Sequence, residues 1–226
     1  LLAQNAGSNY ARQVNTLIGT KGVGLTSGYL YPGATYPYGM VQFTPSYFSK
    51  RSGFVINQLS GGGCEHMGNF PTFPVKGKLK MSPDNILNYR INISEEKGHA
   101  GYYEAMVQED IKAKLTVTER TGMASYEYPA DQQYGTIIIG GGISATPIEQ
   151  AAIVITAPNK CEGYAEGGNF CGLRTPYKVY FVAEFDTDAL ETGTWKREEL
   201  MPNTTFAEGE YSGVYFTFDV NKKKNI

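Results

Sequence analysis

Hydrophobic and polar side chains alternate along several segments of the chain with a period of two residues. Residues 112–118 read Lys-Ala-Lys-Leu-Thr-Val-Thr, with apolar side chains at every second position. A glycine at position 122 interrupts this pattern, and residues 123–128 resume it before Pro129. Because successive side chains of a strand point to opposite faces, the alternation predicts an antiparallel hairpin with one buried and one solvated face.

Other segments are apolar at every position. Thr136–Ile139 is a short β-branched run between glycines, which predicts a strand covered on both faces, and residues 179–185 and 214–218 predict two aromatic strands. Helical patterning is restricted to Asn9–Ile18, with Ser8 or Asn9 as N-cap, and to a turn at Glu198–Met201. We therefore predict an all-β fold, an antiparallel β-sandwich of two large stacked sheets with long N-terminal loops and little helix.

The ends of the chain differ from its centre. Residues 1–8 begin with Leu-Leu-Ala-Gln-Asn and resemble the end of a signal peptide, which indicates an exported protein. Residues 9–220 form the predicted sandwich domain, and the polar residues 221–226 resemble a linker toward a further part of a larger protein. No apolar run reaches the roughly 20 residues that a membrane-spanning helix needs.

The amino-acid composition limits the classes of molecule that the chain is expected to bind. A formal charge of −2 and a pI near 5.8 give no reason to expect nucleic acid or an anionic membrane as partner. The 17 tyrosines and 11 phenylalanines suit both sheet packing and stacking against sugar rings, and packing is the commoner role of such residues. Cys161 and Cys171 flank a glycine-rich stretch and are candidates for a disulfide in an oxidising compartment, which would leave Cys64 as a free thiol.

Two glycine-rich segments stand outside the strand pattern. Residues 31–42 carry two prolines, two glycines and several aromatic side chains, which predicts a rigid loop that displays rings. Residues 57–70 place three consecutive glycines, Gly61–Gly63, among groups able to hydrogen-bond sugar hydroxyls. We predict that this second segment recognises a substrate.

Catalytic groups are not evident in the sequence. Glu65 and His66 are adjacent, and adjacent side chains of an extended segment point to opposite faces, so they do not form an obvious acid–base pair. A glycosidase needs two carboxyl groups across the scissile bond, and no pair stands out among the 22 acidic residues.

The two glycine-rich segments, taken with the rest of the chain, resemble a known family. The relevant stretches are VNTLIGT at 14–20, YPGATYPYGMVQFTP at 31–45, GF at 53–54, N at 57, LSG at 59–61, GC at 63–64, FP at 70–71, GYY at 101–103, AKLTVT at 113–118, FCG at 170–172 and YF at 180–181. Their order is similar to that of glycoside hydrolase family 92, the bacterial exo-acting α-mannosidases. The resemblance covers nearly the whole chain.

The resemblance implies an N-terminal β-sandwich packed on a larger (α/α)6 helical domain, with the active site between them. It implies an inverting, Ca²⁺-dependent enzyme that acts on mannosides and N-glycan-type oligosaccharides. In the family the catalytic acids and the calcium ligands come mainly from the helical domain, so we expect no catalytic or metal-binding residue in this chain and no activity from it alone. The resemblance assigns substrate binding in this chain to Asn57, Ser60, Gly63, Cys64, Glu65 and His66. This chain has Ile56-Asn57-Gln58 where many members carry a His-Thr/Asn-His run, a difference that bears on linkage specificity.

Two other functions remain compatible with these sequence features. One is a stand-alone carbohydrate-binding module, which would bind sugar without a second domain. The other is a purely structural sandwich whose exposed apolar patch docks a neighbouring domain.

Overall fold

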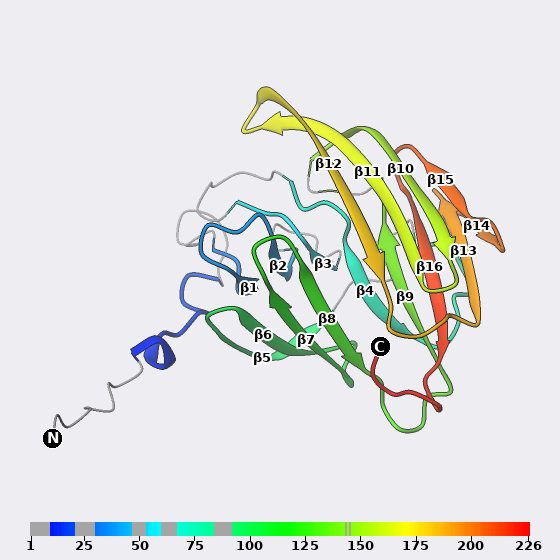
Figure 1. Ribbon diagram of the computed structural model, residues 1–226, viewed down its shortest axis with the longest axis horizontal. Coiled ribbons are helices and arrows are strands. Elements are labelled where there is room, and N and C mark those ends of the chain that lie inside the picture. Colours follow the sequence, from blue (N-terminus) through cyan, green and yellow to red (C-terminus); the bar gives the residue numbers. More distant parts are fainter. Residues whose placement is uncertain are drawn as a thin grey trace, which may run out of the picture.

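The chain folds as a β-sandwich of antiparallel strands, as the sequence predicts (Figure 1). The computed structural model describes residues 10–20, 30–46, 53–59, 67–83, 92–142, 144 and 146–226. Within these ranges one 3-10 turn, η1 (Tyr10–Gln13), precedes the strands. The strands are β1 (Ala34–Thr35), β2 (Gln42–Pro45), β3 (Phe54–Val55), β4 (Thr72–Lys76), β5 (Ile93–His99), β6 (Tyr102–Val107), β7 (Ile111–Val117), β8 (Gly122–Glu127), β9 (Tyr134–Gly140), β10 (Ile148–Ala157), β11 (Lys160–Phe170), β12 (Leu173–Glu184), β13 (Glu191–Lys196), β14 (Glu199–Pro202), β15 (Phe206–Glu208) and β16 (Ser212–Asp219).

One layer is a single eight-stranded sheet, and the facing layer is divided into two four-stranded sheets. The large sheet has the order β1-β2-β3-β4-β9-β16-β13-β14, and the smaller ones run β12-β11-β10-β15 and β5-β6-β7-β8. The β5–β8 sheet lies against β1 and β2, whereas β10 and β15 lie against β16 and β13. Figure 1 shows the two smaller sheets in green and in yellow to orange. The second layer is therefore two sheets placed along one long sheet.

Strand periodicity matches the burial of side chains. In β7, Ile111, Ala113 and Leu115 are buried, and the lysines between them lie on the other face. In β9, the side chains of Ile137, Ile138 and Ile139 are each 1% exposed. They are buried because β9 lies between β4 and β16 in the middle of the large sheet. Both kinds of strand predicted from the sequence are confirmed.

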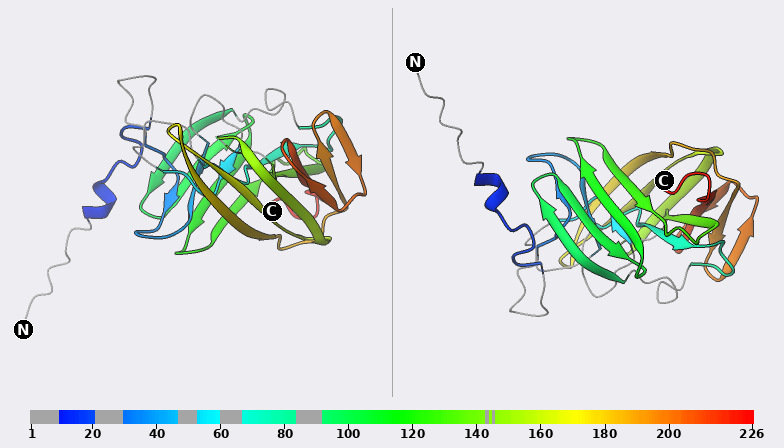
Figure 2. Two further views of the ribbon diagram at one scale, coloured as in Figure 1. Left: turned by 90° about the horizontal axis from the view of Figure 1, so that it is seen from above. Right: turned by 90° about the horizontal axis from the view of Figure 1, so that it is seen from below.

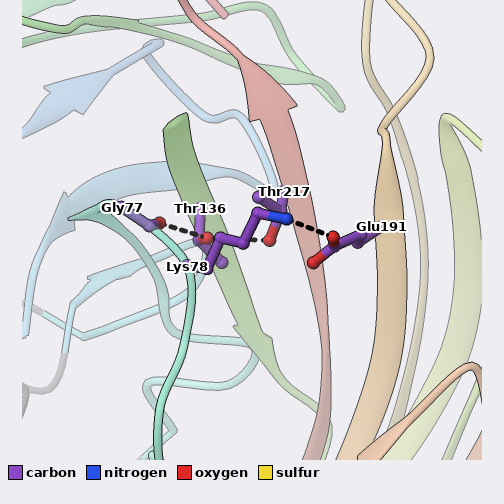
Figure 3. Close-up of polar contacts among 5 residues, drawn as sticks. All are labelled: Gly77, Lys78, Thr136, Glu191 and Thr217. Carbon is purple, nitrogen blue, oxygen red and sulfur yellow. Dashed lines mark hydrogen bonds and ion pairs between the residues drawn. The ribbon is translucent and has the colours of Figure 1, made fainter. Parts of the chain in front are cut away.

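A line of hydrogen bonds and one ion pair crosses the large sheet (Figure 3). The hydroxyl of Thr136 donates to the carbonyl oxygen of Gly77 at 2.7 Å and lies 2.8 Å from the hydroxyl of Thr217. Because Thr136 uses its single hydrogen on Gly77, Thr217 is the donor to Thr136. Lys78 forms an ion pair with Glu191. These bonds fix the segment that follows β4 across β9, β16 and β13, which is a structural role.

Both predicted helical segments differ in the structure. Within the described part of Asn9–Ile18, only the single 3-10 turn η1 forms, and Figure 2 shows it outside the sandwich layers. Glu198–Met201 is not a helical turn, because β14 takes up most of it and pairs with β13, with Leu200 opposite Trp195. Burial of Trp195, which is 0% exposed, stabilises a hairpin that local sequence does not favour.

The last residues of the chain are part of the folded unit. The amide and carbonyl of Ile226 pair with Tyr126 in β8, at 3.1 and 2.7 Å, and the Ile226 side chain is buried. Residues 221–226, which the sequence assigns to a linker, thus end as an additional segment beside β8. Whether they lead to a helical domain stays a prediction. No helix in the described ranges is long and apolar enough to cross a membrane.

Candidate functional site

Of the six predicted recognition residues, only Asn57 lies in a described part of the chain. Ser60, Gly63, Cys64, Glu65 and His66 lie outside the described residues. The structure does describe the residues on either side, 53–59 and 67–83. The candidate site is therefore built from the two flanks of the glycine-rich segment, which we call the loop base (residues 57 and 67–70).

Two asparagine side chains join these flanks. Asn57 Oδ1 accepts a hydrogen bond from the backbone N–H of Asn69 at 2.8 Å, and Asn57 Nδ2 donates to Asn69 Oδ1 at 3.0 Å. The backbone N–H of Gly68 donates to the carbonyl oxygen of Asn57 at 2.7 Å. Asn57 thus bonds both residues 68 and 69. Its amide keeps one N–H and one oxygen lone pair beyond these bonds, so it retains capacity for a ligand.

Strand β12 holds the loop base from the other side. Tyr177 in β12 donates from its hydroxyl to Asn69 Oδ1 at 3.0 Å. The ring of Phe70, which is 1% exposed, packs against the ring of Phe181 with centroids 4.0 Å apart. The loop base is therefore fixed by a strand more than 100 residues further along the chain. The sequence analysis did not identify Asn69 or Tyr177 as site residues. Asn69 lies within the glycine-rich segment 57–70, but no feature of the sequence indicates that Tyr177 is its partner.

The backbone of the loop base lies in the left-handed region at three of the four positions from 67 to 70. Met67, Gly68 and Phe70 have φ values of 57°, 76° and 53°. For residues with a side chain this conformation costs about 1–3 kcal/mol and persists only where the surroundings determine it. The Asn57–Asn69 bonds and the Phe70–Phe181 contact supply such constraints. Strain of this kind is concentrated at functional sites.

Asn69 also carries a hydrogen-bond donor that is not satisfied within the described residues. Its side chain is 0% exposed, and its Nδ2 has no partner among them. A buried donor without a partner costs about 1–3 kcal/mol, so such groups usually have one. The loop base therefore offers a buried amide N–H.

The predicted disulfide between Cys161 and Cys171 is wrong. Cys161 is a free thiol with 0% exposure, and burial raises its pKa to about 12. Cys171 is disulfide-bonded and follows β11, whereas Cys161 lies near the beginning of that strand. Ten residues of extended strand separate the two by about 30 Å, far beyond disulfide range. Cys64 lies outside the described residues.

The loop at residues 31–42 displays two of its three aromatic rings as predicted, whereas the third, Tyr31, is buried. Tyr36 is half exposed and Tyr38 fully exposed, with a left-handed φ of 60°. The backbone beneath is fixed: the N–H of Met40 donates to the carbonyl oxygen of Glu119 at 2.7 Å, and that of Gly39 donates to Tyr36 at 2.9 Å. A Cβ at position 39 would lie 3.1 and 3.2 Å from these two carbonyl oxygens, so a side chain there would require a small shift of the neighbouring backbone.

Acidic side chains and possible metal ligands are the groups relevant to hydrolysis. Among the described residues, no three His, Cys, Asp or Glu side chains come together as a metal site. The hydrogen bond from Tyr102, and then the nearby Lys112, lower the pKa of Glu104. A general acid at neutral pH needs a raised pKa, so Glu104 is not suited to that role.

Comparison with known proteins identifies the family. Residues 13–226 match the model of the glycosyl hydrolase family 92 N-terminal domain. A protein of Arthroderma benhamiae named "Uncharacterized secreted glycosidase" is 31% identical over 138 residues, which are 52% of this chain and 17% of that protein.

Solved structures of α-mannosidases have the same fold. The family GH92 α-mannosidase BT3965 of Bacteroides thetaiotaomicron matches with a TM-score of 0.78 and 24% identity, over 94% of this chain and 32% of that one. The family GH92 inverting mannosidase BT2199 of the same organism matches with a TM-score of 0.79 and 23% identity, over 96% and 30%. This chain thus spans about a third of each solved chain. It belongs to glycosyl hydrolase family 92 and corresponds to the N-terminal domain of that family.

Proposed function

We propose that this chain is the substrate-binding and structural domain of an exported, Ca²⁺-dependent inverting α-mannosidase that acts on mannose-containing glycans. The observation that carries the proposal is the family match over residues 13–226. The names of the matched structures, which include "inverting mannosidase", support the reaction class. The fungal relative's name, a secreted glycosidase, supports export.

The catalytic groups come from polypeptide outside this chain in our proposal. The matched solved chains are about three times as long as the part that corresponds to this domain. No three His, Cys, Asp or Glu side chains of the described residues come together. In our proposal the Ca²⁺ ion is held mainly by the rest of the enzyme.

The contribution of this chain is recognition of the substrate through the glycine-rich segment. The loop base supports this role, because hydrogen bonds and ring packing fix both ends of the segment on the sandwich. A fixed base reduces the entropy that the segment loses when a sugar binds. Asn57 then acts in two ways: it ties the flanks together and presents its remaining amide hydrogen to the sugar.

The experiment compares this chain with the longer polypeptide that contains it. We expect the 226-residue chain to release no mannose from an α-mannoside, and the longer polypeptide to release it in Ca²⁺. Chelation with EGTA should abolish the activity, and added Ca²⁺ should restore it. Proton NMR during the reaction should show β-mannose as the first product, since one displacement inverts the anomeric centre.

Activity of the 226-residue chain alone would overturn the assignment of catalysis to other polypeptide. In the longer enzyme, Asn57→Ala should lower kcat/KM by at least about tenfold, because each 1.4 kcal/mol of transition-state stabilisation is worth that factor. Asn221→Ala, an exposed asparagine in the C-terminal segment, is the matched control and should leave kcat/KM unchanged. Equal effects of the two substitutions would contradict a role for the loop base.

A further inference from the structure

The outward face of the β12-β11-β10-β15 sheet is hollowed. The hollow has a volume of about 370 Å³, within the range of small-ligand sites. It lies on the solvent side, because the alternate residues Ala151, Cys161 and Ala165 are buried on the other face. We call it the outer groove, and the lining residues that matter here are Ala152, Val154, Glu162, Tyr164, Tyr180 and Phe206.

Strand register places apolar side chains across the outer groove in two rows. In one row, Ala152 lies opposite Tyr164, and Tyr164 lies opposite Tyr180. In the other, Val154 pairs with both Phe206 and Glu162. Directly opposed residues of an antiparallel sheet share a face, so these side chains line one surface. On β15, Glu208 lies opposite Ala152, and Phe206 lies opposite Val154 in the second row.

Aromatic rings of the outer groove remain exposed to solvent, although the ammonium group of Lys178 contacts two of them. Tyr180 is 69% exposed and Phe206 is 53% exposed. The ammonium group of Lys178 lies 4.0 Å from the ring centroid of Tyr164 and 5.4 Å from that of Tyr180, and it is also paired with Glu166. Cation–π contacts of this kind orient the tyrosines. The fold does not bury the outer rings, so packing does not account for them.

Glu162 decides what kind of molecule fits the groove. It lies between Val154 and Val182 and forms no ion pair among the described residues. An apolar protein surface laid over it would bury an unpaired carboxylate, at a cost of several kcal/mol. A suitable occupant has to cover aromatic rings and also donate hydrogen bonds to the carboxylate. A pyranose does both, because it has an apolar C–H face and hydroxyl donors.

We propose that the outer groove is a binding site for a neutral oligosaccharide. Pyranose C–H faces pack on Tyr180 and Phe206, and sugar hydroxyls donate to the carboxylate of Glu162. The site goes beyond the proposed function and does not depend on it, since Tyr180 and Glu162 lie on the solvent-facing side of the sheet, whereas the ring of Phe181 contacts Phe70 of the loop base. Phe181 also borders the outer groove.

Isothermal titration calorimetry on the 226-residue chain tests the site, with mannopentaose and cellopentaose as the probes. We expect at least one probe to bind with a Kd of about 1 mM or lower. Tyr180→Ala and Phe206→Ala should each weaken binding about tenfold, because each removes apolar contact worth about 1.4 kcal/mol. Glu162→Ala should weaken it as well. Tyr211→Ala removes an exposed tyrosine elsewhere on the surface and should leave binding unchanged.

Three results would overturn the proposal. The first is no binding of either probe up to about ten times the expected Kd. The second is binding that both ring substitutions leave unchanged. The third is a dimer in sedimentation velocity that Tyr180→Ala dissociates, which would make the face an interface between copies of the chain. Because no hydrolysis is measured, these results are separate from those that test the mannosidase assignment.

Discussion

The loop base makes a quantitative prediction for Asn69→Ala. The Asn69 side chain is 0% exposed, and its Oδ1 accepts hydrogen bonds from Asn57 Nδ2 and from the hydroxyl of Tyr177, each at 3.0 Å. Alanine removes the acceptor but leaves both donors in place. A buried donor that loses its only partner costs about 1–3 kcal/mol. Because both donors are partly buried, we take the lower half of that range for each, which gives about 2–4 kcal/mol. Alanine also removes the buried Asn69 Nδ2, which has no partner among the described residues, and this offsets about 1 kcal/mol, so we expect a net loss of about 1–3 kcal/mol.

Tyr177→Phe is the matched comparison. It removes one donor, while Asn69 Oδ1 keeps its bond from Asn57. The expected loss is about 1 kcal/mol, the net value of a single hydrogen bond. For a domain of this size, 1 kcal/mol corresponds to about 2–4 °C in Tm. At the middle of the range expected for Asn69→Ala, the two variants should therefore differ by about 2–4 °C in Tm.

The assay is urea unfolding followed by far-ultraviolet circular dichroism, with the free energy of unfolding obtained by linear extrapolation. Equal m-values for wild type and variants are required, so that the difference reflects stability alone. If Asn69→Ala costs no more than Tyr177→Phe, Asn69 does not hold the two flanks. The loop base would then be only a packing contact.

Three further predictions concern the core. Gly213→Ala should destabilise the sandwich by at least about 2 kcal/mol, because its Cβ would lie 2.2 Å from the ring of Trp195; a change below 0.5 kcal/mol in urea unfolding would contradict this packing. Cys161 should resist alkylation in the native chain at neutral pH and react after denaturation, since it is buried and its pKa is raised to about 12; a non-reducing peptide map that links it to another cysteine would contradict the structure. Burial raises the pKa values of Tyr126 and Tyr128 above the ordinary value of 10.0, so their contribution to stability is fully present below pH 10 and is lost as pH rises further; urea midpoints that stay constant to pH 12 would refute this.

Local periodicity carried most of the fold prediction. The alternation in β7 and β8 and the apolar run in β9 each depend on which face of one strand is buried, and that information lies within a few residues. The prediction of a helical turn at Glu198–Met201 was wrong because it, too, used only neighbouring residues. Its strand state depends on pairing with β13 and on the burial of Trp195, neither of which is visible within a short window.

The candidate site was less predictable because its contacts are long-range. Asn57 was identified through the family resemblance, and the structure shows it fixed to Asn69. The bond from Tyr177 to Asn69 joins residues 108 positions apart, so nothing in the spacing of the sequence points to it. The Cys161–Cys171 pairing failed because a glycine-rich stretch between two cysteines looks like a loop. Here it forms β11, a long strand that separates them.

Strand β12 connects the two candidate sites by the alternation of its side chains. Phe181 points inward and packs on Phe70 at the loop base, whereas Tyr180, its neighbour, points outward into the outer groove. Phe181 is partly buried against the core, so its loss would cost part of the roughly 3–5 kcal/mol that removal of a fully buried aromatic ring costs. The outward tyrosine is 69% exposed and contributes little by packing. An aromatic side chain at such a position adds to the cost of exposing apolar surface, so the reason for its presence has to be sought in binding, and Glu162 beside it limits what can bind.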